Sequence, residues 1–324
     1  MKKVLITGAA GFIGSHLAEL CIESGYSVRA LVHYNSRNTY GWLEDSKVIN
    51  EIEIVSGDIR DYDGVYNAMQ GVDTVFHLAA LIGIPYSYFT PLAYIKTNVE
   101  GTYNVLQAAR ELDLGNVIIT STSETYGTAQ YVPIDEKHPM VGQSPYSASK
   151  IAADQLAISY HRSFNLPVKL ARPFNTYGPR QSARAVIPTI ITQILSGKES
   201  IKLGNLAPTR DLTFVKDTAR ALIAISESDQ LNGEVTNIGV GEEISIGELA
   251  GLICELMGRD IDIKEDSERV RPENSEVERL LSDNSKILKH TNWRPQYDLR
   301  KGLEETIGWL TTHLNIYKSE IYNI

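Results

Sequence analysis

The sequence predicts an α/β fold in which a doubly wound parallel sheet is joined to a smaller α/β C-terminal domain. The first observation behind this prediction is that short apolar, strand-like runs alternate with helix-like segments along the first half of the chain. The second is the length of 324 residues, which suits one elaborated domain or two closely joined domains with a large core. Alternation of this kind is typical of a parallel sheet that carries helices on both faces.

The individual elements follow from the same periodicities. Six apolar runs are expected to be strands of the main sheet, at 2–7, 27–32, 51–55, 74–78, 116–121 and 168–172. Helices are expected between them at about 16–23, 62–70, 91–112 and 146–164. After Pro173 the pattern loosens, and we expect strands at 200–203 and 212–215 and helices near 185–195, 216–228, 246–257 and 301–313. We therefore predict a first domain over 1–173, to which segments near 211–240 (including a strand at 236–239) return, and a second domain mainly over 174–324.

The charge and the two cysteines exclude several classes of protein. The formal net charge is −9 and there is no basic stripe, which argues against a general nucleic-acid binder. Cys21 and Cys254 form neither a disulfide framework nor a metal-ligand pattern, so we expect two buried small hydrophobic residues and no metal site. No apolar run is long enough to span a membrane, which predicts a cytoplasmic protein without a membrane partner.

A glycine-rich turn directly follows the first predicted strand. Its sequence is Gly8-Ala-Ala-Gly11-Phe12-Ile13-Gly14, and helical periodicity begins just after it. Glycines let a pyrophosphate approach the backbone, and a helix N-terminus offers N–H donors with a partial positive charge. This strand, turn and helix predict a dinucleotide-binding site. The alternative is a tight turn that binds nothing.

A second chemical signal is the pair Tyr146 and Lys150, which are four residues apart and so lie on one helix face. A nearby ammonium favours the phenolate, so we expect Tyr146 to act as a base near neutral pH. Thr122 can supply a hydroxyl to the same oxygen. This trio suits removal of a proton from a sugar or alcohol hydroxyl while hydride leaves its carbon. Glu124 adds an acid/base group that simple alcohol oxidation does not need. Because Thr122 and Glu124 follow the strand at 116–121, we expect them at the sheet edge where ligands bind.

Six motifs occur in a specific order along the chain. They are the glycine turn, His77-Leu78-Ala79-Ala80, Asn98-Val-Glu-Gly-Thr102, Ser121-Thr-Ser-Glu-Thr-Tyr-Gly127, Tyr146-x-x-x-Lys150 and Arg172-Pro-Phe-Asn175-x-Tyr-Gly-Pro179. In this order they resemble the extended short-chain dehydrogenases/reductases that act on nucleotide sugars, over nearly the whole chain. The resemblance implies a Rossmann-type first domain, a smaller substrate-binding domain and a dinucleotide that is recycled within each turnover.

The residues Thr122-Ser123-Glu124 bear on the reaction. This arrangement resembles that of the nucleotide-sugar 4,6-dehydratases, whereas 4-epimerases of the family usually lack the glutamate. The dTDP-glucose dehydratases have an aspartate, resembling a general acid, in the middle, so Ser123 is more similar to the GDP-mannose 4,6-dehydratases. UDP-glucuronate decarboxylases also carry a Ser-Glu pair here. The resemblance therefore implies an NAD(P)-dependent 4,6-dehydratase, with a UDP-glucuronate decarboxylase or a 4-epimerase as alternatives. A non-enzymatic nucleotide sensor would not need Thr122, Glu124, Tyr146 and Lys150 together.

Dehydration explains why an additional carboxylate is wanted. Tyr146 would take the proton of the 4-hydroxyl as hydride leaves carbon 4, and the resulting ketone acidifies the proton on carbon 5. We expect Glu124 to remove that proton, after which water leaves carbon 6 and the hydride returns there. The leaving hydroxyl needs a proton donor, which can be protonated Glu124 itself, directly or through Ser123 or water.

The resemblance also assigns residues to the substrate. The segment 271–286 is similar to one in GDP-mannose dehydratases, and Trp293-Arg294-Pro295 matches the close of the family pattern. By family position, Arg210 and Arg271 would face the diphosphate, where guanidinium groups suit phosphate oxygens. The remaining expected substrate residues are Asn175 at the phosphates or sugar, Val186 and Asn205 at the base, and Pro85 and Tyr86 in the loop 81–90 at the sugar. The runs 121–150 and 178–188 resemble the N-acetylglucosamine nucleotide 4,6-dehydratases of legionaminic-acid-type pathways. That resemblance implies GDP-N-acetylglucosamine, or its UDP equivalent, as substrate.

The end of the second predicted strand bears on the choice of cofactor. NAD enzymes typically place an acid there for the ribose, but this strand is followed by His33, Asn35, Ser36 and Arg37 with no carboxylate. Basic and small polar groups suit a 2′-phosphate, so NADP is favoured; a solvent-facing Arg37 would leave NAD viable. By resemblance the cofactor also contacts Asp58, Ile59, Leu78, Ala79, Ala80, Asn98, Tyr146 and Lys150.

Helices 91–112 and 146–164 carry apolar residues over much of their surface. In the family that the chain resembles, the equivalent helices pair across a two-fold axis, which implies a homodimer. The alternative is that both helices simply pack against the sheet.

Overall fold

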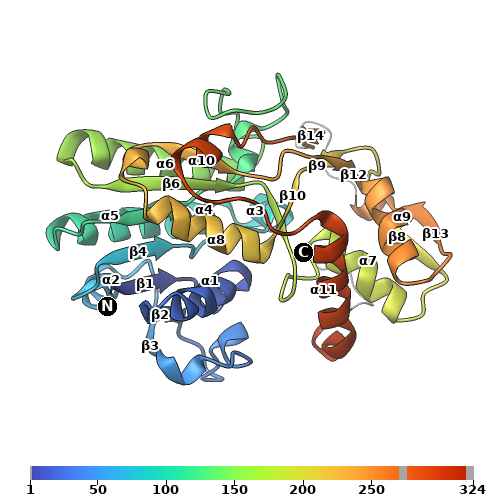
Figure 1. The fold of residues 1–324 in the computed structure, drawn as a ribbon, viewed down its shortest axis with the longest axis horizontal. Helices are drawn as coiled ribbons and strands as arrows, with labels where there is room; N and C mark the ends of the chain where they lie inside the picture. Colours follow the sequence, from blue (N-terminus) through green and yellow to red (C-terminus); the bar gives the residue numbers. More distant parts are fainter. Residues whose placement is uncertain (1, 270–275, 319–324) are drawn as a thin grey trace.

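The computed structural model describes residues 2–269 and 276–318 and is built around a seven-stranded parallel sheet (Figure 1). The strand order is β11-β6-β5-β4-β1-β2-β3, and every adjacent pair in this sheet is parallel. The predicted α/β fold class is therefore confirmed. The strands are β1 (Lys3–Thr7), β2 (Ser27–His33), β3 (Ile52–Gly57), β4 (Thr74–His77), β5 (Val117–Thr120), β6 (Val168–Pro173) and β11 (Val235–Ile238).

Helices cover both faces of this sheet because successive strand side chains point to opposite faces. On β1, Val4 and Ile6 belong to the core under α1 (Phe12–Glu23) and α8 (Val215–Ser226). Leu5 belongs to the opposite core. That core packs against α2 (Tyr62–Met69), α5 (Gly101–Glu111) and α6 (Pro145–Phe164). Both faces of the sheet are buried, which is why its strands appear in the sequence as continuous apolar runs.

The helix predicted at 91–112 is interrupted. It starts as α4 (Pro91–Tyr94), passes through a π-helical turn, labelled η3 (Ile95–Glu100), and continues as α5. Within that turn the Asn98 amide donates to the Leu81 carbonyl (2.9 Å) and accepts from the Leu81 N–H (2.8 Å). A short helix, α3 (Ile84–Phe89), lies in the loop 81–90 and has Pro85 in its first turn. The π-helical turn thus shapes the loop where sugar contacts are expected, which apolar periodicity does not reveal.

The second part of the chain has a core of its own, which lies to the right of the main sheet in Figure 1, beyond the ends of the strands. This core joins α7 (Val186–Leu195), α9 (Ile246–Leu256) and α11 (Leu299–Thr312) to the pair β8 (Ser200–Leu203) and β13 (Asp262–Glu265). Two smaller sheets complete it, β12 (Ile244–Ser245)–β9 (Thr209–Arg210)–β14 (Arg279–Leu280) and β7 (Asn175–Tyr177)–β10 (Leu212–Phe214). The 3₁₀ turns are η1 (Gly41–Leu43), η2 (Ile49–Glu51), η4 (Ser123–Tyr126), η5 (Asp229–Leu231), η6 (Ser267–Arg269) and η8 (Leu314–Ile316).

The two parts are interleaved in sequence. The return of a strand near 236–239 is confirmed, because β11 pairs with β6. The helix α10 (Ser285–His290) and the residues after it also pack on the main sheet, since Ile287 and Trp293 lie in the same core as Val4. The interleaving therefore extends beyond the predicted 211–240, and the boundary at 173 remains a prediction.

Cys21 and Cys254 are buried and form no disulfide, as expected. Across residues 2–269 and 276–318, no helix has the length and apolar character needed to cross a membrane. Nor does that part of the chain gather three His, Cys, Asp or Glu side chains into a possible metal site.

Candidate active site

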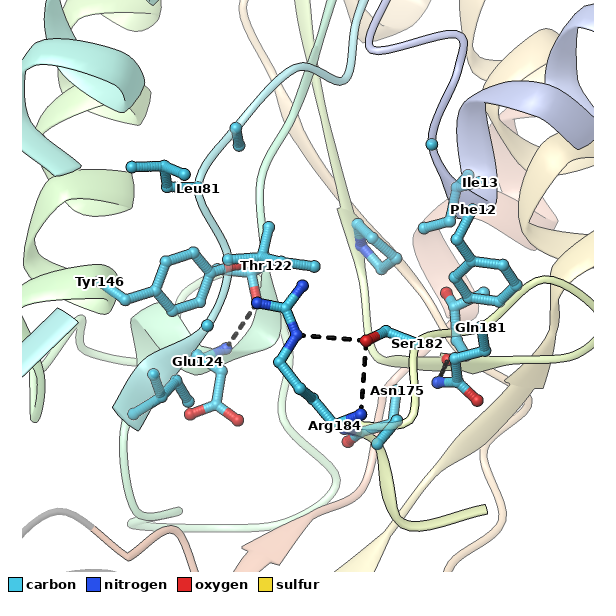
Figure 2. A pocket seen from close by; sticks show the side chains of 18 of the residues that line it. Phe12, Ile13, Leu81, Thr122, Glu124, Tyr146, Asn175, Gln181, Ser182 and Arg184 are labelled. Atoms are coloured by element: carbon cyan, nitrogen blue, oxygen red, sulfur yellow. Dashed lines mark hydrogen bonds between the residues drawn. The ribbon is translucent and has the colours of Figure 1, made fainter. Parts of the chain in front are cut away.

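A cavity of about 1130 Å³ opens at the carboxyl ends of the central strands (Figure 2). Its walls come from the glycine turn, the ends of β2 to β6, the N-terminus of α6 and the segments 173–189 and 203–212. The predicted catalytic residues all line it, namely Thr122, Ser123, Glu124, Tyr146 and Lys150. Most of the predicted cofactor and substrate residues line the same cavity, so the two sequence signals meet in one place.

The glycine turn is packed too tightly for side chains. Gly8 has φ +71°, and a Cβ on it would stand 2.8 Å from the Ala79 nitrogen. A Cβ on Gly14 would stand 2.2 Å from the Gly8 oxygen. The helix α1 begins at Phe12 with no side-chain cap at Gly11, so its first N–H groups remain for a ligand. This cradle at the end of β1 fits the pyrophosphate of a dinucleotide.

A buried network fixes the neighbouring wall at Leu78 and Ala79. The Thr7 hydroxyl oxygen accepts from the N–H groups of both residues (3.2 Å each) and lies 2.8 Å from His77 Nδ1. It therefore donates its proton to Nδ1, and His77 Nε2 donates to Thr102 Oγ1 (3.1 Å). The Thr102 hydroxyl donates in turn to the Asn98 carbonyl (2.7 Å). This pattern requires a neutral His77, and burial, aided by Lys150, lowers the pKa of His77 to about 3.

This network predicts loss of stability in acid. The unfolded chain binds a proton at His77 near pH 6.5 and the folded protein only near pH 3, so the free energy of unfolding falls as pH drops between these values. The slope contributed by one such group is up to about 1.4 kcal/mol per pH unit. His16, whose pKa burial and Arg180 lower to about 4, contributes in the same direction. Urea unfolding at pH about 7 and about 5 should show a smaller loss for His77→Asn than for wild type. Equal losses would contradict the prediction.

Tyr146 and Thr122 point toward one another in the cavity, with Glu124 beside them (Figure 2). A capping box between Ser144 and Ser147, with Pro145 in the first turn, sets the start of α6 and so the place of Tyr146. Thr122 follows β5, has an extended backbone and accepts a hydrogen bond from the Glu124 N–H (3.3 Å). Proximity to the Thr122 side chain lowers the pKa of the Tyr146 phenol.

The electrostatics of Tyr146 differ from the sequence prediction. Burial raises the pKa of its phenol, and the nearby Thr122 side chain lowers it without reversing that effect. The Lys150 ammonium does not reach the phenol; it donates to the Thr120 carbonyl (2.7 Å). A spacing of four residues places two side chains on one helix face but leaves open which acceptor the longer one reaches. Burial therefore opposes ionisation of Tyr146 in the protein alone, and its action as a base near neutral pH remains a prediction.

Behind these residues lies a buried ion pair between α6 and β6. Arg172 Nη2 donates to Asp154 Oδ2 (2.7 Å), and the same oxygen accepts from the Ser121 hydroxyl (2.5 Å). Both charged side chains are at most 2% exposed. The Arg172 guanidinium also lies 4.5 Å over the ring of Tyr126. Burial lowers the pKa of Lys150. Asp154 raises this pKa and Arg172 lowers it, so the ion pair influences the ionisation of Lys150.

Only some of the residues expected at the cofactor ribose line the cavity. His33 lines the cavity, and its Nδ1 lies 3.8 Å from Asp58, which also lines it. Asp58 is held by Arg60 through two hydrogen bonds of 3.0 and 2.5 Å, and the Arg60 guanidinium keeps the pKa of that carboxyl low. Asn35 instead ties its own loop together, and the exposed side chains of Ser36 and Arg37 lie outside the cavity lining. Ile59, Leu78, Ala79 and Ala80 do line it, whereas Asn98 is buried behind the wall.

The expected substrate residues within the described part of the chain all line the cavity, namely Pro85, Tyr86, Asn175, Val186, Asn205 and Arg210. Arg271 lies outside the described residues. Asn175 Oδ1 is buried without a hydrogen-bond partner among the described residues, which suits an atom that awaits a ligand. Arg210 lies 3.4 Å from Glu276, another lining residue.

Several lining residues were not predicted as site residues, among them Gln181, Ser182 and Arg184. Figure 2 shows Arg184 reaching from the Ser182 loop toward the side of the cavity that holds Thr122 and Tyr146. The segment 178–188 had been recognised as a motif, but nothing in its pattern tells which side chain turns inward. Which of these side chains points into the cavity depends on the position of the segment in the fold.

The chain is similar in sequence to a known protein family and to individual proteins. The family model described as GDP-mannose 4,6 dehydratase matches residues 5–306. A putative UDP-glucose 4-epimerase of Methanocaldococcus jannaschii is 32% identical over 95% of this chain and 98% of its own length. A UDP-N-acetyl-alpha-D-glucosaminuronate decarboxylase of Bacillus cytotoxicus is 33% identical over 95% of this chain and 97% of its own length.

Solved structures agree with the sequence comparison. DesIV, a dTDP-glucose 4,6-dehydratase from Streptomyces venezuelae solved with NAD and TYD bound, superposes with a TM-score of 0.89. It is 30% identical, and the match covers 98% of this chain and 99% of DesIV. These relatives carry out different reactions on nucleotide sugars, so they establish the family and not the individual reaction. The chain belongs to the GDP-mannose 4,6 dehydratase family, within the extended short-chain dehydrogenases/reductases that act on nucleotide sugars.

Proposed function

We propose that this protein is a nucleotide-sugar 4,6-dehydratase that converts GDP- or UDP-N-acetylglucosamine to the 4-keto-6-deoxy sugar with loss of water. The observation that carries the proposal is the position of Glu124, which lines the same cavity as Thr122 and Tyr146, two side chains that point toward one another. An oxidation at carbon 4 needs only the pair. A carboxylate beside it supplies the proton transfers that elimination of water requires.

The cofactor in this proposal is a nicotinamide dinucleotide, held by the glycine turn and by the wall at Leu78–Ala80. When bound, such a dinucleotide would supply a hydride acceptor for carbon 4 and a hydride donor for carbon 6. We propose NADP as the preferred form, because no carboxylate follows β2 and because Asp58 is already paired with Arg60. His33 and Arg60 line that end of the cavity. Calorimetric titration with NADP and NAD tests this preference, and tighter binding of NAD would overturn it.

The chain's own groups account for the proton transfers. Tyr146 takes the proton of the 4-hydroxyl, and the Thr122 hydroxyl, which points toward Tyr146, is placed to bond to the same oxygen. Glu124 removes the proton from carbon 5 once the neighbouring carbon is a ketone. The hydroxyl that leaves carbon 6 takes up a proton from Glu124, directly or through Ser123, and departs as water. Ser123 lines the cavity and is 3% exposed, so it is shielded from bulk water.

Mass spectrometry of the products tests the proposal. The protein is incubated separately with GDP-N-acetylglucosamine, UDP-N-acetylglucosamine, GDP-mannose and UDP-glucuronate. Loss of one water from an N-acetylglucosamine donor is the expected result, and it also identifies the base. Loss of carbon dioxide from the uronate would replace the proposal by a decarboxylase, the activity named for the Bacillus cytotoxicus relative. Products that keep the mass of the substrate would indicate an epimerase.

We also propose a homodimer. Several large apolar side chains are exposed along α3, α4, η3 and α5, namely Phe89 (74%), Leu92 (60%), Ile95 (53%) and Tyr103 (44%). An apolar stripe of this kind on an otherwise polar surface is typical of an interface. Light scattering after size-exclusion chromatography should give twice the chain mass, and the double variant Leu92→Asp/Ile95→Asp should elute as a monomer. A wild-type monomer would contradict the proposal.

A further inference from the structure

A side cavity of about 260 Å³ adjoins the main cavity next to Tyr146. Tyr94 lines the side cavity but not the main cavity, and its ring centroid lies 6.2 Å from that of Tyr146 and 6.3 Å from that of Tyr86. The side cavity is lined by Ala80, Leu81, Ile82, Gly83, Tyr86, Tyr94 and Arg184. A group attached close to the reacting carbon therefore lies near the side cavity, which is about one aromatic ring away from the Tyr146 phenol.

Most of the wall of the side cavity is apolar. Leu81 packs with Tyr94 and Tyr146, and Ile82 and Tyr86 remain 58% and 42% exposed at its rim. The Tyr94 hydroxyl does not serve a ligand, because it donates to the Gly83 carbonyl (2.5 Å). These surfaces offer contact to a small apolar group and no hydrogen bond from Tyr94.

The cationic group of the side cavity is the Arg184 guanidinium. Its Nε donates to the Ser182 hydroxyl (3.2 Å), and Arg184 forms no ion pair within residues 2–269 and 276–318. Its Nη1 lies 3.1 Å from the place that a Cβ on Gly83 would occupy. The terminal N–H groups thus face the side cavity and suit an uncharged or anionic oxygen.

On the basis of the proposed function, we propose that this side cavity binds the acylamino group on carbon 2 of the sugar. Arg184 donates to the acyl oxygen, and the acyl methyl packs against Tyr86 and Tyr94. An acetamido group combines one strong acceptor with one methyl group, which matches the single guanidinium and the apolar walls. A bare hydroxyl would leave those walls without contact. A uronate carboxylate would bring a second negative charge into the cavity that holds Glu124.

The test compares two donors that carry the same nucleotide and differ only at carbon 2, one with N-acetylglucosamine and one with glucose. In Gly83→Ala, the added methyl stands 3.5 Å from both Tyr86 Cβ and Tyr94 Oη, inside the side cavity. Gly83 has φ −69°, which alanine adopts without strain. We expect kcat/KM for the acetamido donor to fall about tenfold or more, with a change of about twofold or less for the glucose donor. Arg184→Met should lower kcat/KM for both donors, with the larger loss for the acetamido donor, and its exposed position keeps the fold intact.

The matched control is Gly115→Ala, where an added Cβ meets no atom within 4 Å. It should change neither donor. Equal losses for both donors in Gly83→Ala and Arg184→Met would overturn the acyl site while leaving the dehydratase intact. If wild type dehydrates neither donor, the proposed function fails first, and this separates the two failures.

Discussion

Glu124→Gln should lower the rate of water loss by at least about 100-fold, because acid/base groups of this kind contribute about 10² to 10⁴ in rate. The amide keeps the shape of the side chain but can neither take the proton of carbon 5 nor return one to the leaving hydroxyl. Thr122 and Tyr146 are untouched, so oxidation at carbon 4 should continue. The variant should therefore form up to one equivalent per active site of a sugar that has lost two hydrogens and kept its 6-hydroxyl, because the hydride then remains on the bound dinucleotide.

Two measurements check this result. Mass spectrometry distinguishes the loss of two hydrogens from the loss of water, and deuterium from heavy water should enter carbon 5 in wild type but not in the variant. Glu51→Gln serves as a control, because Glu51 is an exposed carboxylate at the end of η2, away from the cavity lining. Dehydration near the wild-type rate in Glu124→Gln would remove Glu124 from its assigned role.

Arg172→Met should lower the free energy of unfolding by about 3–5 kcal/mol, because it leaves a buried carboxylate without its partner. Asp154 is fully buried, and its second oxygen, Oδ1, already has no hydrogen-bond partner in the described residues. The Ser121 hydroxyl and the field of the Lys150 ammonium would remain, but neither replaces the direct ion pair. The methionine keeps much of the volume, so the loss reports the charge and not a cavity.

A double-mutant cycle in urea separates charge from packing. Asp154→Asn combined with Arg172→Met removes both charges and should be more stable than Arg172→Met alone. The single variant should also move the pH dependence of catalysis, since Arg172 and Asp154 act in opposite directions on the pKa of Lys150. A loss below about 1 kcal/mol in Arg172→Met would mean that the ion pair is not important to the fold.

Local chemistry explains which features could be predicted from the sequence. The glycine turn requires glycine at 8 and 14 for steric reasons, and these positions are visible as a motif. The strands of the sheet are apolar on both faces, so they can be recognised in the sequence as continuous apolar runs. The catalytic set was recognisable because each member follows a strand or begins a helix.

Long-range packing explains what the sequence did not reveal. The acceptor of Lys150 is the Thr120 carbonyl, on a strand remote in sequence, and the burial of Tyr146 outweighs the effects of spacing on its pKa. The inward turn of Arg184 depends on a loop that meets Gly83 about 100 residues away. The placement of α10 on the main sheet is likewise a tertiary contact, since its own apolar pattern is too short to name a partner.

The return of the chain to the main sheet has a consequence for synthesis on the ribosome. Strand β6 is buried along its whole length, and its outer edge is covered by β11, which is made some 60 residues later. Trp293 completes the core under α1 and donates to the Asp217 carbonyl (2.9 Å). A nascent chain that has emerged only as far as β6 therefore has an open apolar sheet edge, a template for aggregation. The main sheet is therefore complete only once β11 has been made, and the core under α1 only once Trp293 has been made.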